Sequence, residues 1–202
     1  AEVSSLRWFN TRPGYVFHPM NAYEADGKII AYVCLYDAAP LFPLADGSPG
    51  FRSGARLVRW TFDLSGATDT VLEEPMDDLD SEFPRLDERR TGLSYRHGYY
   101  AADTSNVKSV KMNAIAHMDL ATGQRQVCSF GPGDMVSEPV FTPRSASAFE
   151  GEGWLTAVVW RAADNVSDLV VLDAMNVDRG PVGMARVPRR VPFGFHGNWV
   201  GA

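Results

Sequence analysis

Four residues that could build a metal site recur along this chain at nearly even intervals. They are His18, Glu82, Glu138 and His196, and the steps between them are 64, 56 and 58 residues. Imidazole nitrogens and carboxylate oxygens bind or support divalent metals, and the groups around one ion must converge in space. A repeating unit that returns the chain to a common axis once per step would supply that convergence.

The elements that must position these residues are β-strands. The apolar runs are short, rich in Val, Ile, Tyr and Trp, and bounded by Gly, Pro, Asp or Asn, while helical periodicity is almost absent. Eighteen Gly and 13 Pro punctuate the 202 residues. Clear examples of such runs are residues 28–36, 55–64, 113–120, 154–161 and 167–174. The sequence therefore predicts an all-β chain of many strands.

The strands are predicted to repeat. Asp63, Asp119 and Asp173 each end a strand-like run with a turn-forming aspartate, and they lie 56 and 54 residues apart. Residues 27–33 also resemble residues 153–159. A period of about 55 residues with about four strands is typical of a β-propeller blade. In a propeller the first strand of every blade lines the central channel, so the four metal-site candidates are expected to meet near the axis.

Composition limits the other functions this chain could have. The 202 residues are 45% hydrophobic, which suits one globular unit, residues 1–202. The net charge of −6 gives no basic surface for nucleic acid. The sequence shows neither a long apolar span nor a signal peptide. We expect Cys34 and Cys128, which lie in apolar runs, to be buried free thiols of a cytoplasmic protein.

Five segments of the sequence carry a further signal. They are Phe17-His18-Pro19-Met20-Asn21-Ala22-Tyr23-Glu24, Glu82-Phe83-Pro84-Arg85, Tyr95-Arg96-His97-Gly98-Tyr99, Ser137-Glu138-Pro139-Val140-Phe141 and Val191-Pro192-Phe193-Gly194-Phe195-His196-Gly197. These segments resemble the carotenoid cleavage oxygenase family, and most of all its bacterial lignostilbene (stilbene-cleaving) dioxygenases. They occur in the family's order and extend over essentially the whole chain, so together they are far more specific than any one of them.

The resemblance implies a seven-bladed β-propeller with a non-haem iron(II) on its axis, bound by four histidines. Three glutamates hydrogen-bond the ligand imidazoles in this family. By resemblance, His18 and His196 are iron ligands, and Glu82 and Glu138 are two of the orienting glutamates. Neutral imidazole suits iron(II), and a carboxylate on the other ring nitrogen fixes tautomer and orientation. The implied reaction is cleavage by dioxygen of a conjugated C=C bond in a stilbene-like or apocarotenoid substrate, giving two carbonyl products.

The chain supplies only about half of the family's site. Two histidines and one glutamate are missing, so the chain resembles the C-terminal half of such a domain, roughly the last four blades. We expect His97 and His117 to be structural or surface residues, and Asn21 and Glu24 to hold the His18 strand by local hydrogen bonds. A companion chain with the N-terminal half, or a second copy, would close the propeller. The alternative function is a catalytically inactive half-propeller that acts as a binding or assembly module.

Overall fold

The computed structural model describes residues 6–48, 54–105 and 111–200, which fold into three antiparallel sheets. The first sheet contains β1 (Tyr15–Ala25), β2 (Lys28–Tyr36), β3 (Arg56–Asp63) and β4 (Leu72–Pro75). The second contains β5 (Asp80–Leu86), β6 (His97–Asp103), β7 (Ala114–Asp119) and β8 (Gln124–Ser129). The third contains β10 (Val140–Pro143), β11 (Gly153–Arg161), β12 (Val166–Asp173) and β13 (Pro181–Val187), with β9 (Met135–Val136) paired to β11.

Each sheet is a meander in which strands that follow one another in sequence also pair in space. The described residues also form two short 3-10 helices, η2 (Glu88–Arg90) and η3 (Val177–Arg179). The all-β prediction is confirmed, and the five clearest predicted strands match β2, β3, β7, β11 and β12 to within one residue at each end.

The aspartate repeat marks the same place in all three sheets. Asp63, Asp119 and Asp173 are the last residues of β3, β7 and β12. In each case the carboxylate accepts a hydrogen bond from the backbone N–H two residues later, at 2.8, 3.0 and 2.9 Å. Such a local bond ends the strand and starts the turn to the next one. The repeat seen in the sequence is therefore a repeat of whole sheets.

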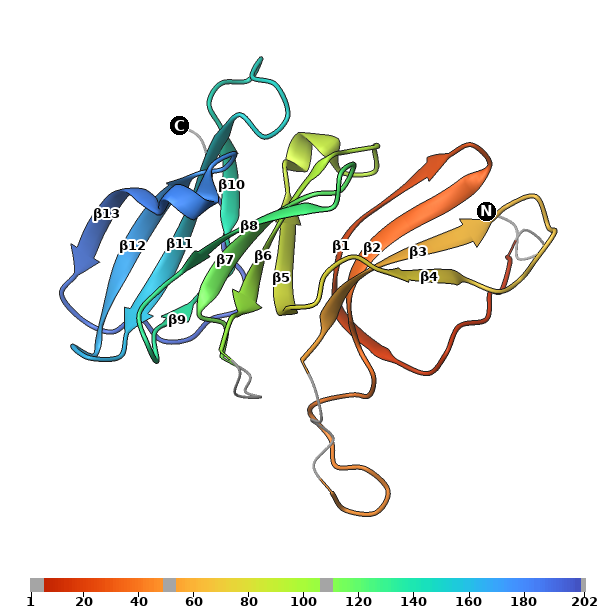
Figure 1. The fold of residues 1–202 in the computed structure, drawn as a ribbon, viewed down its shortest axis with the longest axis horizontal. Coiled ribbons are helices and arrows are strands. Elements are labelled where there is room, and N and C mark those ends of the chain that lie inside the picture. Colours follow the sequence, from red (N-terminus) through yellow and green to blue (C-terminus); the bar gives the residue numbers. More distant parts are fainter. Residues whose placement is uncertain (1–5, 49–53, 106–110, 201–202) are drawn as a thin grey trace.

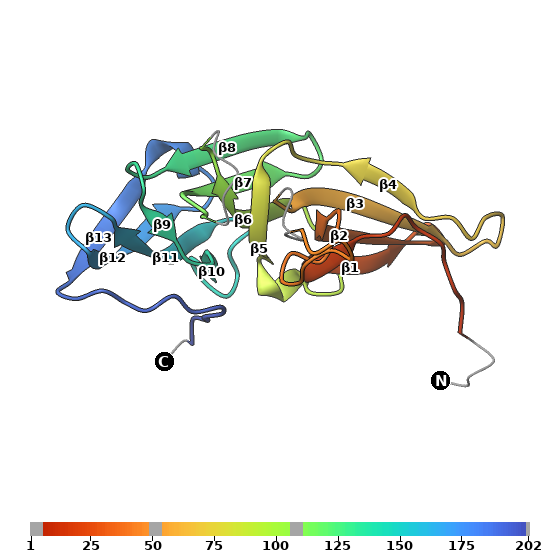
Figure 2. The ribbon, with the colours of Figure 1, turned by 90° about the horizontal axis from the view of Figure 1, so that it is seen from below.

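The three sheets follow one another across the molecule, and their first strands β1, β5 and β10 lie together (Figure 1). His18 lies in β1, Glu82 lies in β5, and Glu138 lies two residues before β10. His196 follows the last strand, in a C-terminal segment (residues 188–200) that runs back beneath the third sheet (Figure 2).

The described residues do not confirm the expected count of about four blades. They form three sheets, and His196 lies in a segment without a strand, so this candidate residue has no sheet of its own among the described residues.

The core lies between successive sheets. Alternate residues of a strand point to opposite faces, so Tyr99 of β6 packs with Leu155 of the third sheet while Tyr100 packs with Leu57 of the first. All four side chains are fully buried, and burial of each stabilises the fold by about 1.5–3 kcal/mol. The second sheet, buried on both faces, therefore fixes the other two sheets relative to each other.

Cys34 and Cys128 are buried free thiols, as predicted. Burial raises the pKa of both thiols, so they contribute apolar packing and stay protonated at neutral pH. Within the described residues, no helix has the length and apolar character needed to cross a membrane.

Candidate metal centre

The first half of the candidate site is a hydrogen-bonded pair of side chains on two neighbouring first strands. The pairing of β1 with β2 is irregular between Val16 and Asn21, where Pro19 has no N–H to donate. Within this irregular stretch, His18 donates from Nδ1 to Oε2 of Glu82 at 2.6 Å. Glu82 is only 5% exposed, so the carboxylate holds the imidazole in a water-poor environment.

A distortion of β5 helps to place both imidazoles. The register of β5 shifts just after Glu82, and Phe83 has a φ of 53°, which is unusual for a bulky residue. The Phe83 N–H donates to Glu82 Oε2 at 2.9 Å. The Phe83 ring lies 5.2 Å from the ring of His18 and 6.1 Å from that of His196. Sequence reasoning missed this role of Phe83, although a proline such as Pro84 within a strand is typical of an edge or a bulge.

The second half of the site joins the C-terminal segment to the start of the third sheet. His196 donates from Nδ1 to Oε1 of Glu138 at 3.2 Å, and the Gly197 N–H donates to Oε2 at 3.0 Å. The Arg85 guanidinium lies 3.2 Å from the same Oε2. Glu138 is 5% exposed, so this nearly buried carboxylate has three donors around it. The contact with Arg85 was not predicted from the sequence.

The two imidazoles lie close to each other. Their ring centroids are 5.0 Å apart and the ring planes cross at 78°. Because each Nδ1–H is directed at a carboxylate, each Nε2 carries a free lone pair in the neutral ring. No described residue forms a hydrogen bond with either Nε2. Two such nitrogens are suitable donors for iron(II).

The charge balance also fits a cation at this place. Oε1 of Glu82 is buried and has no hydrogen-bond partner among the described residues. Burial, and then the negative charge of Glu82, raise the pKa of nearby Tyr36, which therefore remains a neutral phenol. A bound cation near His18 would offset the unsatisfied negative charge of Glu82.

The site is incomplete within the described chain. No group of three or more His, Cys, Asp or Glu residues that could hold a metal ion occurs in residues 6–48, 54–105 and 111–200. His18 and His196 therefore offer two imidazole ligands, and any further ligand must come from elsewhere.

The remaining histidines form a separate, buried pair. His97 and His117 are 6% and 4% exposed, and Nδ1 of the first lies 2.9 Å from Nε2 of the second. Burial and the nearby His97 lower the pKa of His117 to about 4. His97 and His117 were expected to be structural or surface residues, and their burial shows that they are structural.

Asn21 ties β1 to the turn between β5 and β6. Its amide donates to the carbonyl oxygens of Arg90 and Leu93 at 3.1 and 3.2 Å, and its Oδ1 accepts from Gly92 N–H at 3.0 Å. Both amide N–H groups and the amide oxygen of Asn21 are therefore bonded to this turn. Asn21 thus supports the His18 strand through hydrogen bonds, as expected, but these bonds reach a turn about 70 residues away and are not local.

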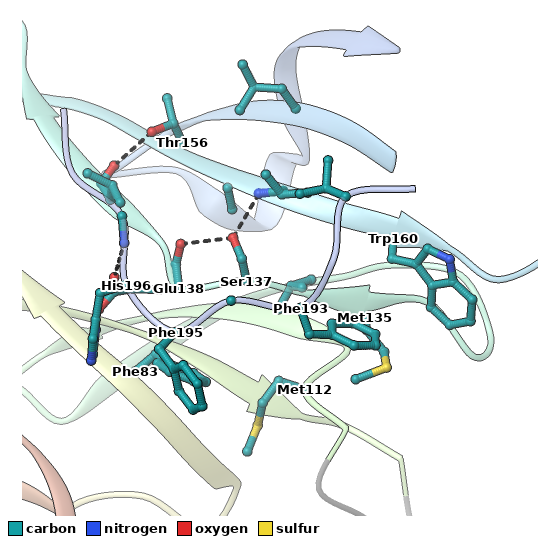
Figure 3. A pocket seen from close by; sticks show the side chains of 18 of the residues that line it. Phe83, Met112, Met135, Ser137, Glu138, Thr156, Trp160, Phe193, Phe195 and His196 are labelled. Atoms are coloured by element: carbon teal, nitrogen blue, oxygen red, sulfur yellow. Dashed lines mark hydrogen bonds and ion pairs between the residues drawn. The ribbon is translucent and has the colours of Figure 1, made fainter. Parts of the chain in front are cut away.

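A pocket of about 510 Å³ opens beside His196 and Glu138, between the third sheet and the C-terminal segment (Figure 3). Most of its labelled side chains are aromatic or apolar: Phe83, Met112, Met135, Trp160, Phe193 and Phe195. The pocket is therefore apolar with a polar end formed by the candidate ligand and its carboxylate. Such a cavity suits an apolar small molecule.

Comparisons with known proteins show which proteins this chain is similar to. Residues 1–201 match the family described as retinal pigment epithelial membrane protein. The chain is 38% identical to lignostilbene-alpha,beta-dioxygenase isozyme III of Sphingomonas paucimobilis, over 98% of this chain and 43% of that protein. It is 31% identical to apocarotenoid-15,15'-oxygenase of Synechocystis, over 93% of this chain and 39% of that protein.

Solved structures show the same fold. The crystal structure of Pseudomonas brassicacearum lignostilbene dioxygenase superposes with a TM-score of 0.85 at 34% identity, covering 94% of this chain and 42% of that one. The cobalt-substituted Synechocystis ACO gives a TM-score of 0.85 at 30% identity, covering 96% and 41%. The chain thus spans about two-fifths of the length of these relatives. The family match over residues 1–201 and the 38% identity to a lignostilbene dioxygenase show that this chain belongs to the carotenoid oxygenase family.

Proposed function

We propose that this chain forms part of a non-haem iron(II) dioxygenase that cleaves a conjugated C=C bond of a stilbene-like or apocarotenoid substrate into two carbonyl products. The supporting observation is the pair of imidazoles, each fixed through Nδ1 by a buried glutamate and each with Nε2 left free. The names of its relatives, lignostilbene dioxygenase and apocarotenoid oxygenase, support the same reaction class.

In this proposal the histidines hold the metal and the glutamates set their geometry. His18 and His196 would bind iron(II) through Nε2, while Glu82 and Glu138 keep the proton on Nδ1 and fix the ring planes. When bound, iron(II) supplies the redox chemistry that activates dioxygen. Two further histidines and a third glutamate would come from an N-terminal half or from a second copy.

The apolar pocket would exclude water and take the substrate. Phe83 lines the pocket and also packs against both imidazoles, so a molecule in the pocket would lie next to the candidate metal. Met112 and Phe195 extend the apolar wall away from Glu138. An elongated aromatic or polyene substrate would gain from burial against these side chains.

Open sheet edges support the second candidate, an inactive module that associates with another chain. β13 is an outer strand, and its Val182 and Met184 are 63% and 60% exposed. An exposed apolar edge strand readily pairs with another chain. In this alternative the His18–His196 cluster would hold no iron.

Iron content measured together with particle size tests both candidates. The purified protein and its His18→Ala, His196→Ala and His117→Gln variants are loaded with iron(II) and analysed by light scattering and elemental analysis. We expect iron to be lost in the first two variants and retained in the third. One iron per two chains would support a site shared by two copies. Absence of iron from the unaltered protein in every assembly state would contradict the dioxygenase proposal.

A further inference from the structure

We propose that Arg85 is a positioning residue that fastens the C-terminal segment, so that His196 presents Nε2 to the metal. The part that concerns iron rests on the proposed function above. The fastening itself rests only on contacts between the described residues.

One guanidinium joins three separate parts of the chain. Arg85 of β5 lies 3.2 Å through Nη1 from Oε2 of Glu138, at the start of the third sheet. The same Nη1 donates to the Gly197 carbonyl at 3.3 Å, and Nη2 donates to Oδ1 of Asn198 at 3.3 Å. Nη2 also pairs with Glu88, which accepts from the Asn198 amide at 3.4 Å. The Arg85 side chain is 14% exposed and that of Glu138 is 5% exposed, so this ion pair is shielded from water.

The C-terminal segment has little else to hold it near His196. Residues 188–200 contain no strand, and the side chain of His196 is 56% exposed. The neighbouring Phe195 and Trp199 are 76% and 59% exposed and add little burial. Ordering an unpaired segment costs conformational entropy. The polar contacts to Glu138 and Arg85 must therefore offset most of that cost.

Arg85 also keeps Glu138 in place. A nearly buried carboxylate that loses its cationic partner is strongly destabilised, and it would turn toward solvent. That movement would remove the acceptor from both His196 Nδ1 and the Gly197 N–H. One substitution at Arg85 would thus loosen the segment and free the imidazole ring.

The test compares Arg85→Gln with Arg89→Gln in the intact protein. Arg89 is a matched control because it also pairs with a buried carboxylate, Asp87, and donates to backbone carbonyls of residues 145, 146 and 148. None of these contacts involves Glu138 or residues 194–199.

The first measurement is hydrogen exchange of residues 193–200 in metal-free protein. We expect at least about tenfold faster exchange in Arg85→Gln at the Gly197 amide, and no change in Arg89→Gln. The second is iron(II) affinity, which should fall by about tenfold to a hundredfold in Arg85→Gln alone, the range for residues that orient metal ligands. Arg85→Lys keeps the charge but not the planar fork, so it should rescue only part of both effects.

Unchanged exchange in Arg85→Gln would overturn the fastening, and faster exchange with unchanged iron affinity would overturn the positioning role. If Arg85→Gln does not fold, Asn198→Ala removes part of the same network without leaving a buried charge, and unchanged exchange there would also overturn the inference. If the unaltered protein binds no iron, the proposed function fails while the exchange measurement still decides whether Arg85 fastens the segment.

Discussion

The four histidines form two close pairs that differ in chemistry. The ring centroids of His18 and His196 are 5.0 Å apart, and those of His97 and His117 are 5.1 Å apart. In the first pair each Nδ1 is bonded to a buried glutamate. In the second pair a ring nitrogen of one histidine is bonded to a ring nitrogen of the other at 2.9 Å.

The difference shows that proximity of imidazoles alone does not make a metal site. Glutamates bind the Nδ1 atoms of His18 and His196 and so leave both Nε2 lone pairs free. The contact between His97 and His117 occupies one ring nitrogen of each, and the remaining Nδ1 of His117 is buried without a partner among the described residues. The carboxylates therefore decide which pair can bind a metal.

Acidification should produce the largest effect, at the His97–His117 pair. Burial lowers the pKa of His117 from about 6.5 to about 4 and lowers that of His97 as well. The neutral ring is favoured in the fold, so this stability is present above pH 6.5 and is lost as the pH falls toward 4. For His117 the loss is about 3 kcal/mol in the free energy of unfolding.

Urea unfolding of metal-free protein at pH 7.5 and pH 4.5 measures this loss. His117→Gln should show a smaller difference between the two pH values and should bind iron as the unaltered protein does. An equal difference in protein and variant would show that this pair does not carry the acid sensitivity.

Glu138→Gln should give the next largest effect, about a hundredfold weaker binding of iron(II). Glutamine keeps the shape but lacks the charge that Arg85 needs, and it accepts less strongly from His196 and Gly197. Isothermal titration of metal-free protein with iron(II) measures the affinity. Faster hydrogen exchange in residues 193–200 should accompany the loss, and its absence would separate Glu138 from the C-terminal segment.

Glu82→Gln should have the smallest effect, about tenfold weaker iron(II) binding. His18 lies in a paired strand, so its backbone stays in place when the Nδ1 acceptor is weakened. The same titration measures the change, with hydrogen exchange of residues 193–200 expected to remain unchanged. A loss as large as that in Glu138→Gln would show that strand anchoring does not protect His18.

Much of the fold could be predicted because its signals are local. Apolar runs bounded by turn residues located β2 and β11, and the recurring aspartates located the ends of β3, β7 and β12. The number of sheets could not be predicted in the same way. His196 repeats the spacing of the other candidates but lies in a segment that pairs with no strand in the described chain.

The residues of the site were predicted from their type and order, but two of their supports were not. Phe83 reaches both imidazoles only because β5 is distorted after Glu82. Arg85 reaches Glu138 and Gly197 across 53 and 112 residues of sequence. Contacts over such distances depend on how whole sheets pack, which no local pattern records.

The strands, their repeat, and the types and order of the residues His18, Glu82, Glu138 and His196 could be read from the sequence alone. Strand patterns and turn-forming aspartates act within a few residues, so they can be read without the fold. The three-dimensional packing alone shows which glutamate pairs with which histidine, that His97 and His117 contact each other, and which cation secures the C-terminal segment. Those choices depend on the packing of three sheets, which brings distant side chains within hydrogen-bonding distance.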